Sequence, residues 1–547
     1  MTMTQQQEIH PTIYISPMTA APPQDMKQSA VVKHLVPHPL TADCIEEVLN
    51  HLLDSSGSLY SCALVNRLWN HLAIPLLWYH PFGNKLHDRK ARILFETYIS
   101  CFPDDKKNML SMKRPHFPIQ RPLFHYPKYL RGFDWGNFQF AIKEWFSTMP
   151  QHHDLNTKLQ SSKFFIANYL LGRCSGLRVL RIEPDASTKD NKFLDLVSLS
   201  NFRFIFSKLE KLEIQFDSCC ENWLPSLELI ALFATKLSIC SRNIQHISIA
   251  DKNSRFNSSR LPSYICEALW QLIKAQTNLI TLEIHEFWNP ERSELFYDAL
   301  ESQARSLKFL SISHISQFHL LLPTLTSCTN LETLEFRTVP DTNMETLLYT
   351  KDSTSQLSIK KLLCYDFKGD PRIHRLTLGI VIFMTNQHLR ELYLPVEVRP
   401  ELLDVICQYC PNLVNLHLVL TTPLLLKILP YISTLPLKSL ALFDKDKSSF
   451  PIELIQQVAQ SFPPTLCNLE INFHMTSQGL QYFLGNCRGS LKKLVIHNKT
   501  MNDQYLAVVA HYAKVKKSLK IFMYDGKFSE EMLDNARIWI PFIENVQ

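Results

Sequence analysis

The chain has 547 residues, of which 46% are hydrophobic, 20% charged and 11% aromatic, and its formal net charge is +6. This apolar content excludes a disordered protein, and the length indicates several domains or one extended repeat array. A small net charge with no long run of Lys or Arg argues against a nucleic-acid partner.

The sequence carries no sign of export or membrane insertion. Its first residues lack a basic segment followed by an apolar core, and no apolar run reaches the ~18–20 residues that cross a bilayer. We therefore expect a soluble protein, cytoplasmic and/or nuclear, with no membrane partner. Its 14 cysteines are then expected to be reduced, and the single CxxC, Cys407 to Cys410, lacks the second pair of a zinc site. We expect no metal and no cofactor.

Residues 1–32 lack apolar periodicity and are predicted to be a disordered tail. The pattern changes at LTADCIEEVLNHLL, which predicts a short helix that Thr41 or Asp43 can cap, with an apolar face made by Ile45, Val48, Leu49 and Leu52. A second helical block, LYSCALVNRLWNHLA, follows the turn DSSGS and is interrupted at Pro75. A module this small buries a modest core, so we expect residues 35–80 to dock on a partner.

This module, LTADCIEEVLNHLLDSSGSLYSCALVNRLWNHLAIPLLW, resembles the F-box in its acidic residue, Leu/Ile-rich helix, Leu-Val pair, Trp and terminal Leu-Trp. It differs where Thr41 replaces the Pro that usually follows the first Leu, although Thr can still cap the helix. The resemblance implies a three-helix unit that binds a Skp-type adaptor and, through it, a cullin and a RING subunit. It implies adaptor-binding roles for Leu40, Ile45, Val48, Leu49, Leu52, Leu64, Val65, Trp69 and Trp78.

Residues 81–173 are predicted to form a helical and aromatic connecting region, because helical stretches alternate there with Pro-rich segments. Its aromatic residues are expected to pack against the next domain rather than to form a ligand cage. They are Phe124, Tyr126, Tyr129, Phe133, Trp135 and Phe138.

The rest of the chain repeats one hexad: an apolar residue, two variable residues, Leu, one variable residue and another apolar residue. The copies are LRVLRI, LEKLEI, IQHISI, LITLEI, LKFLSI, LETLEF, IKKLLC, LRELYL, LVNLHL, LKSLAL, LCNLEI, LKKLVI and the degenerate LKIFMY. Each hexad has strand periodicity and follows a helical segment, so residues 174–547 are predicted to be a leucine-rich-repeat solenoid. CPNLVNLHL resembles the repeats that accompany F-boxes. We expect FSEEMLDNARIWIPFIENVQ to be an amphipathic capping helix.

The expected fold is thus α/β: a short N-terminal three-helix F-box, then a solenoid with a curved parallel sheet inside and helices outside. Variable hexad positions should face the concave surface, where repeat proteins bind partners. The candidate substrate-binding residues form an acidic strip suited to a basic partner and an aromatic patch, although solvated strand residues explain them equally well. They are Glu213, Glu283, Phe309, Glu335, Tyr393, His417 and Phe443.

The sequence holds no catalytic motif such as GxSxG, HExxH or a P-loop, so we do not expect an enzyme. The favoured function is the substrate-recognition subunit of an SCF-type E3 ubiquitin ligase, with an unknown protein substrate on the repeats. The alternative is a non-ligase repeat scaffold that binds or sequesters a protein partner. The sequence does not separate the two.

Overall fold

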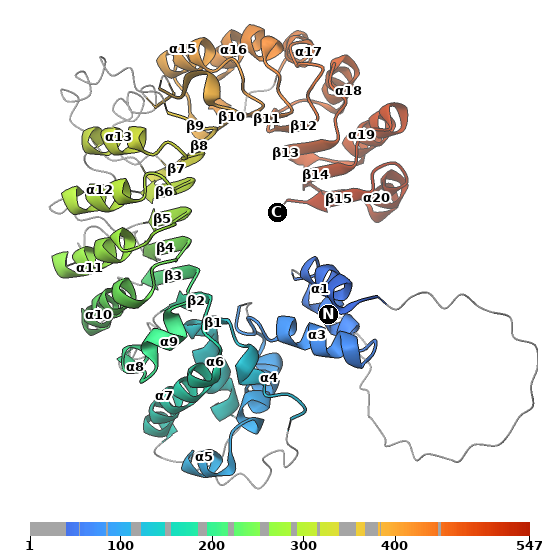
Figure 1. Cartoon of the computed structure of the whole chain (residues 1–547). Coiled ribbons are helices and arrows are strands. Elements are labelled where there is room, and N and C mark those ends of the chain that lie inside the picture. The colour runs from blue at the N-terminus through green and yellow to red at the C-terminus, as the bar shows by residue number, and fades with distance from the viewer. Residues whose placement is uncertain are drawn as a thin grey trace, which may run out of the picture.

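A computed structural model of the chain describes residues 40–53, 55–83, 86–110, 122–147, 155–183, 194–216, 224–251, 262–285, 293–313, 318–338, 357–366, 381–382, 384–446 and 450–546. The predicted tail at residues 1–32 lies outside these ranges. The described residues form a small N-terminal helical module and a long arc in which strands line the inner wall and helices the outer wall (Figure 1).

The N-terminal module consists of α1 (Ala42–Asn50), α2 (Ser56–Ala63) and α3 (Arg67–Leu77). Each helix begins at a polar cap, because the side chains of Thr41, Ser55 and Asn66 accept hydrogen bonds from backbone N–H groups of the first turn. Of the two predicted caps of α1, Thr41 and Asp43, Thr41 is the one observed. A small separate core holds the helices together and consists of Ile45, Leu49, Leu59, Ala63 and Ala73.

The arc is built on one sheet of 15 strands, all parallel and in chain order from β1 to β15. The strands are β1 (Gly132–Asp134), β2 (Val179–Ile182), β3 (Lys211–Phe216), β4 (His246–Asp251), β5 (Thr281–His285), β6 (Phe309–Ser313), β7 (Thr333–Thr338), β8 (Lys361–Asp366), β9 (Glu391–Glu397), β10 (Asn415–Leu420), β11 (Ser439–Asp444), β12 (Asn468–Ile471), β13 (Lys493–Met501), β14 (Ile521–Gly526) and β15 (Phe542–Asn545). Each strand thus pairs with the strands that precede and follow it in sequence, which is the order of a repeat solenoid, as predicted.

The thirteen hexads coincide with strands β2 to β14. Their first, fourth and sixth residues point into the core; in the first copy these are Leu177, Leu180 and Ile182, all at 0% exposure. These side chains join one continuous core with residues of the outer helices. A single unit would leave this apolar surface in water, so each unit needs its neighbours.

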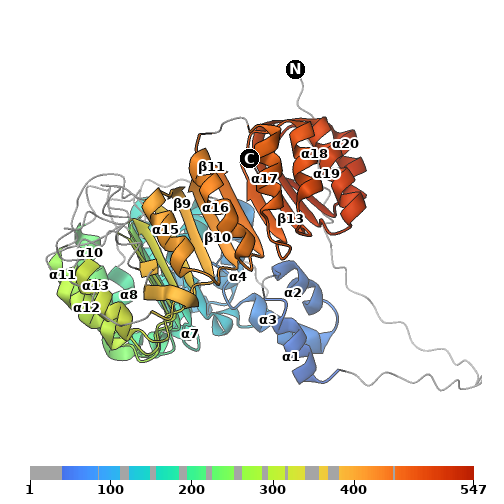
Figure 2. The same ribbon diagram turned by 90° about the horizontal axis from the view of Figure 1, so that it is seen from above.

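Helices cover the outer wall of the arc, as Figure 2 shows from above. They are α8 (Leu194–Val197), α9 (Phe202–Phe206), α10 (Leu224–Cys240), α11 (Ser263–Lys274), α12 (Ser293–Ser302), α13 (Phe318–Ser327), the 3-10 helix η5 (Asn386–His388), α15 (Pro400–Tyr409), α16 (Thr422–Thr434), α17 (Ile452–Gln460), α18 (Ser477–Asn486), α19 (Asp503–Lys516) and α20 (Glu530–Arg537). The connecting region contributes α4 (Asp88–Ser100), α5 (Asp104–Met109), η1 (Tyr126–Tyr129), α6 (Trp135–Ser147) and α7 (Leu155–Arg173).

The sheet begins earlier than predicted. β1 lies in the region expected to connect the module to the solenoid and pairs with β2, so the sheet starts before residue 174, where the solenoid was predicted to begin. Its sequence, LRGFDW from Leu130, is a hexad in which Phe133 replaces the usual Leu. As predicted, the aromatic residues of this region pack: Phe133, Trp135 and Phe138 are buried in the main core.

The C-terminal end also differs from its prediction. The expected capping helix is short, because α20 ends at Arg537 and the chain then returns to the sheet as β15. Ile540 is fully buried, whereas the side chain of Phe542 is half exposed. The array therefore ends in an edge strand beside β14 and not in a helix.

Candidate functional site

The helical module carries a concentrated apolar surface. Seven large apolar side chains within residues 40–68 are exposed: Leu40, Val48, Leu53, Tyr60, Leu64, Val65 and Leu68. Leu64 and Val65, at 65% and 62% exposure, occupy the turn between α2 and α3. So many exposed apolar side chains in a small unit make the module a candidate interaction site.

The residues predicted to bind an adaptor differ in their exposure to solvent. Leu40, Val48, Leu64 and Val65 are exposed, and Leu52 and Trp69 are partly buried against the module core. Ile45 and Leu49, in contrast, have 1% and 0% exposure and form that core. They lack the surface that a direct contact needs, so their contribution is to hold α1 in place.

Trp78 lies at the joint between the module and the arc. Its ring packs on Tyr126 at 4.0 Å between centroids and meets Tyr98 edge-on at 5.2 Å. It is packed against the main core rather than the module core. Its part in the adaptor contact stays a prediction, and the contacts that the structure gives it are those of the joint.

The backbone makes the same joint. The N–H groups of Arg131 and Gly132 donate to the carbonyl of Tyr79 at 2.9 and 2.8 Å. This pairing is the one that recurs between strands, since Arg178 and Val179 donate in the same way to the carbonyl of Arg131. The Tyr79 carbonyl thus takes the place that the carbonyl of a preceding strand takes elsewhere in the sheet. The helical module is therefore joined directly to β1.

His80 is wedged into this joint between two glycines. A Cβ atom on Gly132 would lie 2.3 Å from the His80 ring, and one on Gly83 would lie 2.6 Å from it. The close approach explains why these two positions are glycine. Burial lowers the pKa of His80, so the ring is neutral at physiological pH.

The inner face of the sheet displays one residue from each strand in a continuous row. The strand registers align the fifth hexad position throughout, and we call this row the inner ladder. From β1 to β15 it reads Asp134, Arg181, Glu213, Ser248, Glu283, Ser311, Glu335, Leu363, Tyr393, His417, Ala441, Glu470, Val495, Met523 and Glu544.

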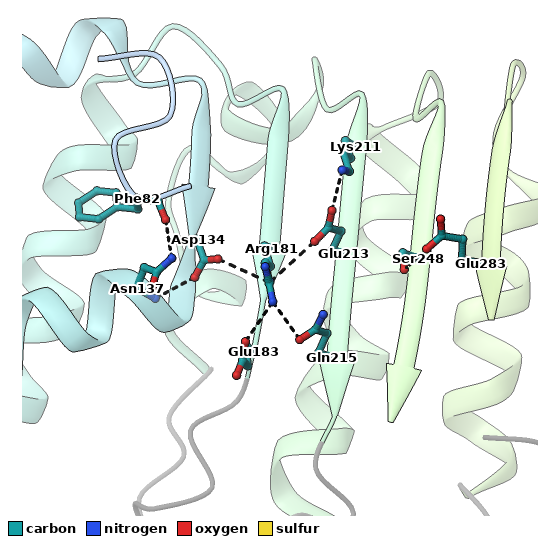
Figure 3. A network of polar contacts seen from close by, with 10 residues as sticks. All are labelled: Phe82, Asp134, Asn137, Arg181, Glu183, Lys211, Glu213, Gln215, Ser248 and Glu283. Carbon is teal, nitrogen blue, oxygen red and sulfur yellow. Dashed lines mark hydrogen bonds and ion pairs between the residues drawn. The ribbon is translucent and has the colours of Figure 1, made fainter. Parts of the chain in front are cut away.

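The N-terminal part of the inner ladder is an ion-pair network around Arg181 (Figure 3). The Nε atom of Arg181 lies 3.6 Å from Asp134 and 3.8 Å from Glu213, and its Nη2 atom lies 3.5 Å from Glu183. Asp134 is anchored in turn by the backbone N–H of Asn137, at 2.8 Å. The network ties β1, β2 and β3 together beside the joint. Burial raises the pKa of Asp134, an effect opposed by the hydrogen bond from Asn137 and by Arg181.

The predicted acidic strip is largely neutralised within the molecule. Lys211 pairs with Glu213 at 2.7 Å, and Arg337 pairs with Glu335 at 2.8 Å. Glu335 is also buried, while Glu283 accepts a hydrogen bond from Ser248 at 2.8 Å. All three glutamates share the inner ladder, but two of them are engaged by a neighbouring cation.

The predicted aromatic residues separate into a cluster and an outlier. Rings lie next to one another from β8 to β13, in the order Tyr365, Tyr393, His417, Phe443 and His497, with centroid distances of 5.1, 4.1, 5.0 and 5.4 Å. We call these five the ring row. Phe309 occupies the third hexad position on β6, where its register partners are Thr281 and Thr333, so it is not part of this row.

A carboxylate borders the ring row on β12. Glu470 lies 2.8 Å from the Nε2 atom of His497, and this hydrogen bond lowers the pKa of the Glu470 carboxyl. Burial lowers the pKa of His417 to about 4, although Glu470 opposes this shift. At physiological pH His417 is therefore a neutral ring beside an ionised carboxylate.

Tyr365 and His497 were not predicted. Both occupy the seventh hexad position, as Phe443 does, one residue beyond the buried apolar position that ends the hexad. Two residues farther along a strand than the inner ladder, such a side chain returns to the same face of the sheet. Applying the period-2 rule one step past each hexad would have found them.

Chemistry based on metals or activated thiols finds no support in the described residues. No group of three His, Cys, Asp or Glu side chains that could hold a metal lies in those ranges. Burial raises the pKa of Cys410 to about 12 and that of Cys407 to about 11, which disfavours the thiolate that metal binding requires. In the same ranges, every helix is too short or too polar to cross a membrane.

No protein-family model matches the chain, and no curated protein does. Among solved structures it is similar to a complex of Rad7 and Elc1 from yeast, at 14% identity and a TM-score of 0.34, over 73% of this chain and 90% of that one. It is also similar to a protein from Bacteroides fragilis at 12% identity and a TM-score of 0.22, over 73% of this chain and 85% of that one. These low scores contribute nothing to the functional argument.

Proposed function

We propose that the chain is a non-catalytic substrate receptor of an SCF-type ubiquitin ligase. The module α1–α3 is an F-box that binds a Skp-type adaptor, and through it a cullin and a RING subunit. The inner face of the solenoid binds the protein to be modified. The observation that carries the proposal is the apolar surface of the module, where an F-box-like sequence leaves Leu64 and Val65 in water.

The joint supports this proposal because a receptor must hold its client in a fixed position relative to the ligase. The carbonyl of Tyr79 and the ring of His80 contact the first strand, and Trp78 packs on Tyr126 and Tyr98 of the region before it. A flexible tether would instead require a linker with few contacts. The arrangement therefore suits a rigid receptor.

The test is co-expression of the full chain with a Skp-type adaptor, followed by affinity purification. Each exposed apolar side chain contributes about 1–2 kcal/mol on burial at an interface. The double variant Leu64→Asp/Val65→Asp should therefore lose at least tenfold of the recovered adaptor. Leu123→Asp is the matched control, because Leu123 is 83% exposed and lies outside the module; this variant should retain the adaptor.

Recovery of cullin separates the ligase receptor from a non-ligase scaffold. A receptor brings cullin down together with the adaptor, whereas a scaffold brings down the adaptor alone. Adaptor recovery that is equal for wild type and the double variant would rule out the proposed interface. A thermal unfolding curve of each variant establishes that the module still folds.

A further inference from the structure

The ring row is a partly exposed aromatic platform on the inner wall of the arc. Tyr365 is 39% exposed, and Tyr393, His417, Phe443 and His497 are partly exposed. Large aromatic side chains with little rotational freedom are common anchors in protein interfaces. Elsewhere along the inner ladder the positions hold charged, small or aliphatic side chains and no aromatic ring, so the platform is a local feature of β8 to β13.

The charges around the platform indicate what lies on it. Three basic side chains near the row already have acidic partners: Arg337 with Glu335, Lys361 with Glu391, and Lys445 with Glu397. Among the described residues, Glu470 forms no ion pair with a Lys or Arg: its partner is the imidazole of His497, and the charge of Lys493 helps to lower its pKa without an ion pair. Its side chain is 36% exposed, so the carboxylate is open to a ligand.

The rings and the carboxylate are within electrostatic reach of one another. Glu470 influences the pKa of both Tyr393 and His417, and its partner His497 lies 5.4 Å from the Phe443 ring. Aromatic faces attract cations, and a guanidinium can stack on a ring while its N–H groups pair with a carboxylate. Lysine offers the charge but not the planar stacking surface.

We propose that the ring row and Glu470 form a docking site for an arginine-bearing extended segment of a partner protein. One arginine stacks on Phe443 and pairs with Glu470, while neighbouring side chains of the segment lie along the remaining rings. The inference rests on the proposed function only in taking that segment to belong to the client. In place of the predicted acidic strip, this proposal assigns the recognition of a basic partner to one carboxylate, Glu470, beside aromatic rings.

Fluorescence polarisation on the full chain tests the site. The probe is a labelled peptide with three arginines separated by glycine and serine. Its citrulline counterpart keeps the side-chain shape without the charge, and a third peptide carries glutamate. A cation–π contact together with one charge-assisted hydrogen bond is worth about 1.4 kcal/mol or more. The arginine peptide should therefore bind at least tenfold more tightly than the citrulline peptide.

Variants locate the binding. Glu470→Gln and Phe443→Leu should each weaken binding of the arginine peptide by fivefold or more. Glu544→Gln is the matched control, because Glu544 occupies the same ladder position on β15; it should leave the affinity unchanged. Equal binding of the arginine and citrulline peptides, tighter binding of the glutamate peptide, or an unaffected Glu470→Gln variant would each overturn the proposal.

The two proposals fail separately. If the chain retains the adaptor but discriminates against no peptide, the arginine site is wrong and the receptor function stands. If it binds the arginine peptide through Glu470 but retains no adaptor, the docking site stands and the ligase function is wrong. The peptide measurement needs no adaptor, so neither result depends on the other.

Discussion

A single imidazole in the ring row couples the stability of the molecule to pH. His417 lies between the rings of Tyr393 and Phe443, and its pKa falls from 6.5 to about 4 through burial. The charged or titratable groups that influence it are Glu470 and His497. Below pH 6.5 the unfolded chain binds a proton that the folded chain excludes until about pH 4. Stability therefore decreases as the pH falls through this window.

Replacing this imidazole should remove that dependence. We predict that His417→Phe loses less stability than wild type between pH 6.5 and pH 4. The difference should grow by at most about 1.4 kcal/mol per pH unit, the value for one proton. Urea unfolding across the window measures it, with His511→Phe on the surface of α19 as control. Parallel pH profiles for wild type and His417→Phe would contradict the prediction.

At the scale of elements, the joint between the helical module and β1 depends on the absence of a side chain. A methyl group on Gly132 would overlap the His80 ring, and His80 adjoins the Tyr79 carbonyl that accepts from β1. Overpacking of a closed site commonly costs about 1–3 kcal/mol. The ring must move, and its movement disturbs the backbone pairing of the joint.

Gly132→Ala should therefore destabilise the joint by about 1–3 kcal/mol. Hydrogen exchange should show faster exchange of the Arg131 and Gly132 amides, which are the two donors to Tyr79. Gly485→Ala on α18 is the control, since a Cβ there meets nothing within 4 Å and Ala favours the helix. Unchanged amide protection in Gly132→Ala would show that the His80 ring can move aside without disturbing the hydrogen bonds to Tyr79.

The strands were predictable where the hexads recur in a regular array, with Leu at the fourth position or, in two copies, Ile247 or Phe522. All thirteen recognised hexads are strands, but β1 was missed because its hexad stands outside that array, in a segment rich in aromatic residues and proline. β15 was missed because Ile543 replaces Leu at the fourth position and the polar Asn545 takes the sixth, apolar position. β1 and β15 are the two edge strands of the sheet. An edge strand pairs with one neighbour only and tolerates proline, so both form although their sequences depart from the usual hexad.

The candidate surfaces were predictable in position but not in charge state. Alternation along each strand identified Glu213, Tyr393 and His417 as inward-facing residues. The neutralisation of Glu335 depends on Arg337, two residues away, and the row from Tyr365 to His497 depends on register across six strands. The registers align equivalent hexad positions, so the row follows once the hexads are aligned, whereas the ion pairs depend on side-chain conformations that the alternation does not specify.

Across the whole molecule, the solenoid should respond to damage locally. Each unit contacts chiefly its neighbours, so stability passes along the array by nearest-neighbour coupling. β15 covers one edge of β14 and contributes the buried Ile540. Removing it uncovers a strand edge and apolar side chains, and the effect should fade over a few units.

We predict that deletion of residues 538–547 lowers hydrogen-exchange protection in β13 and β14 while β2 to β6 keep theirs. Phe542→Ser is the control, because this side chain is half exposed and the backbone pairing of β15 survives the change. Loss of protection throughout the sheet would indicate a single cooperative unit instead of a repeat array.

The acceptor that Tyr79 offers to β1 has an evolutionary consequence. Because the module attaches through the same two hydrogen bonds that join later strands, the helical module and the length of the array can change independently. Gaining or losing a repeat unit between the module and the ring row would change the position of the ring row relative to the helical module, while the module itself stayed the same. Paralogues could thereby acquire different reach by duplication alone.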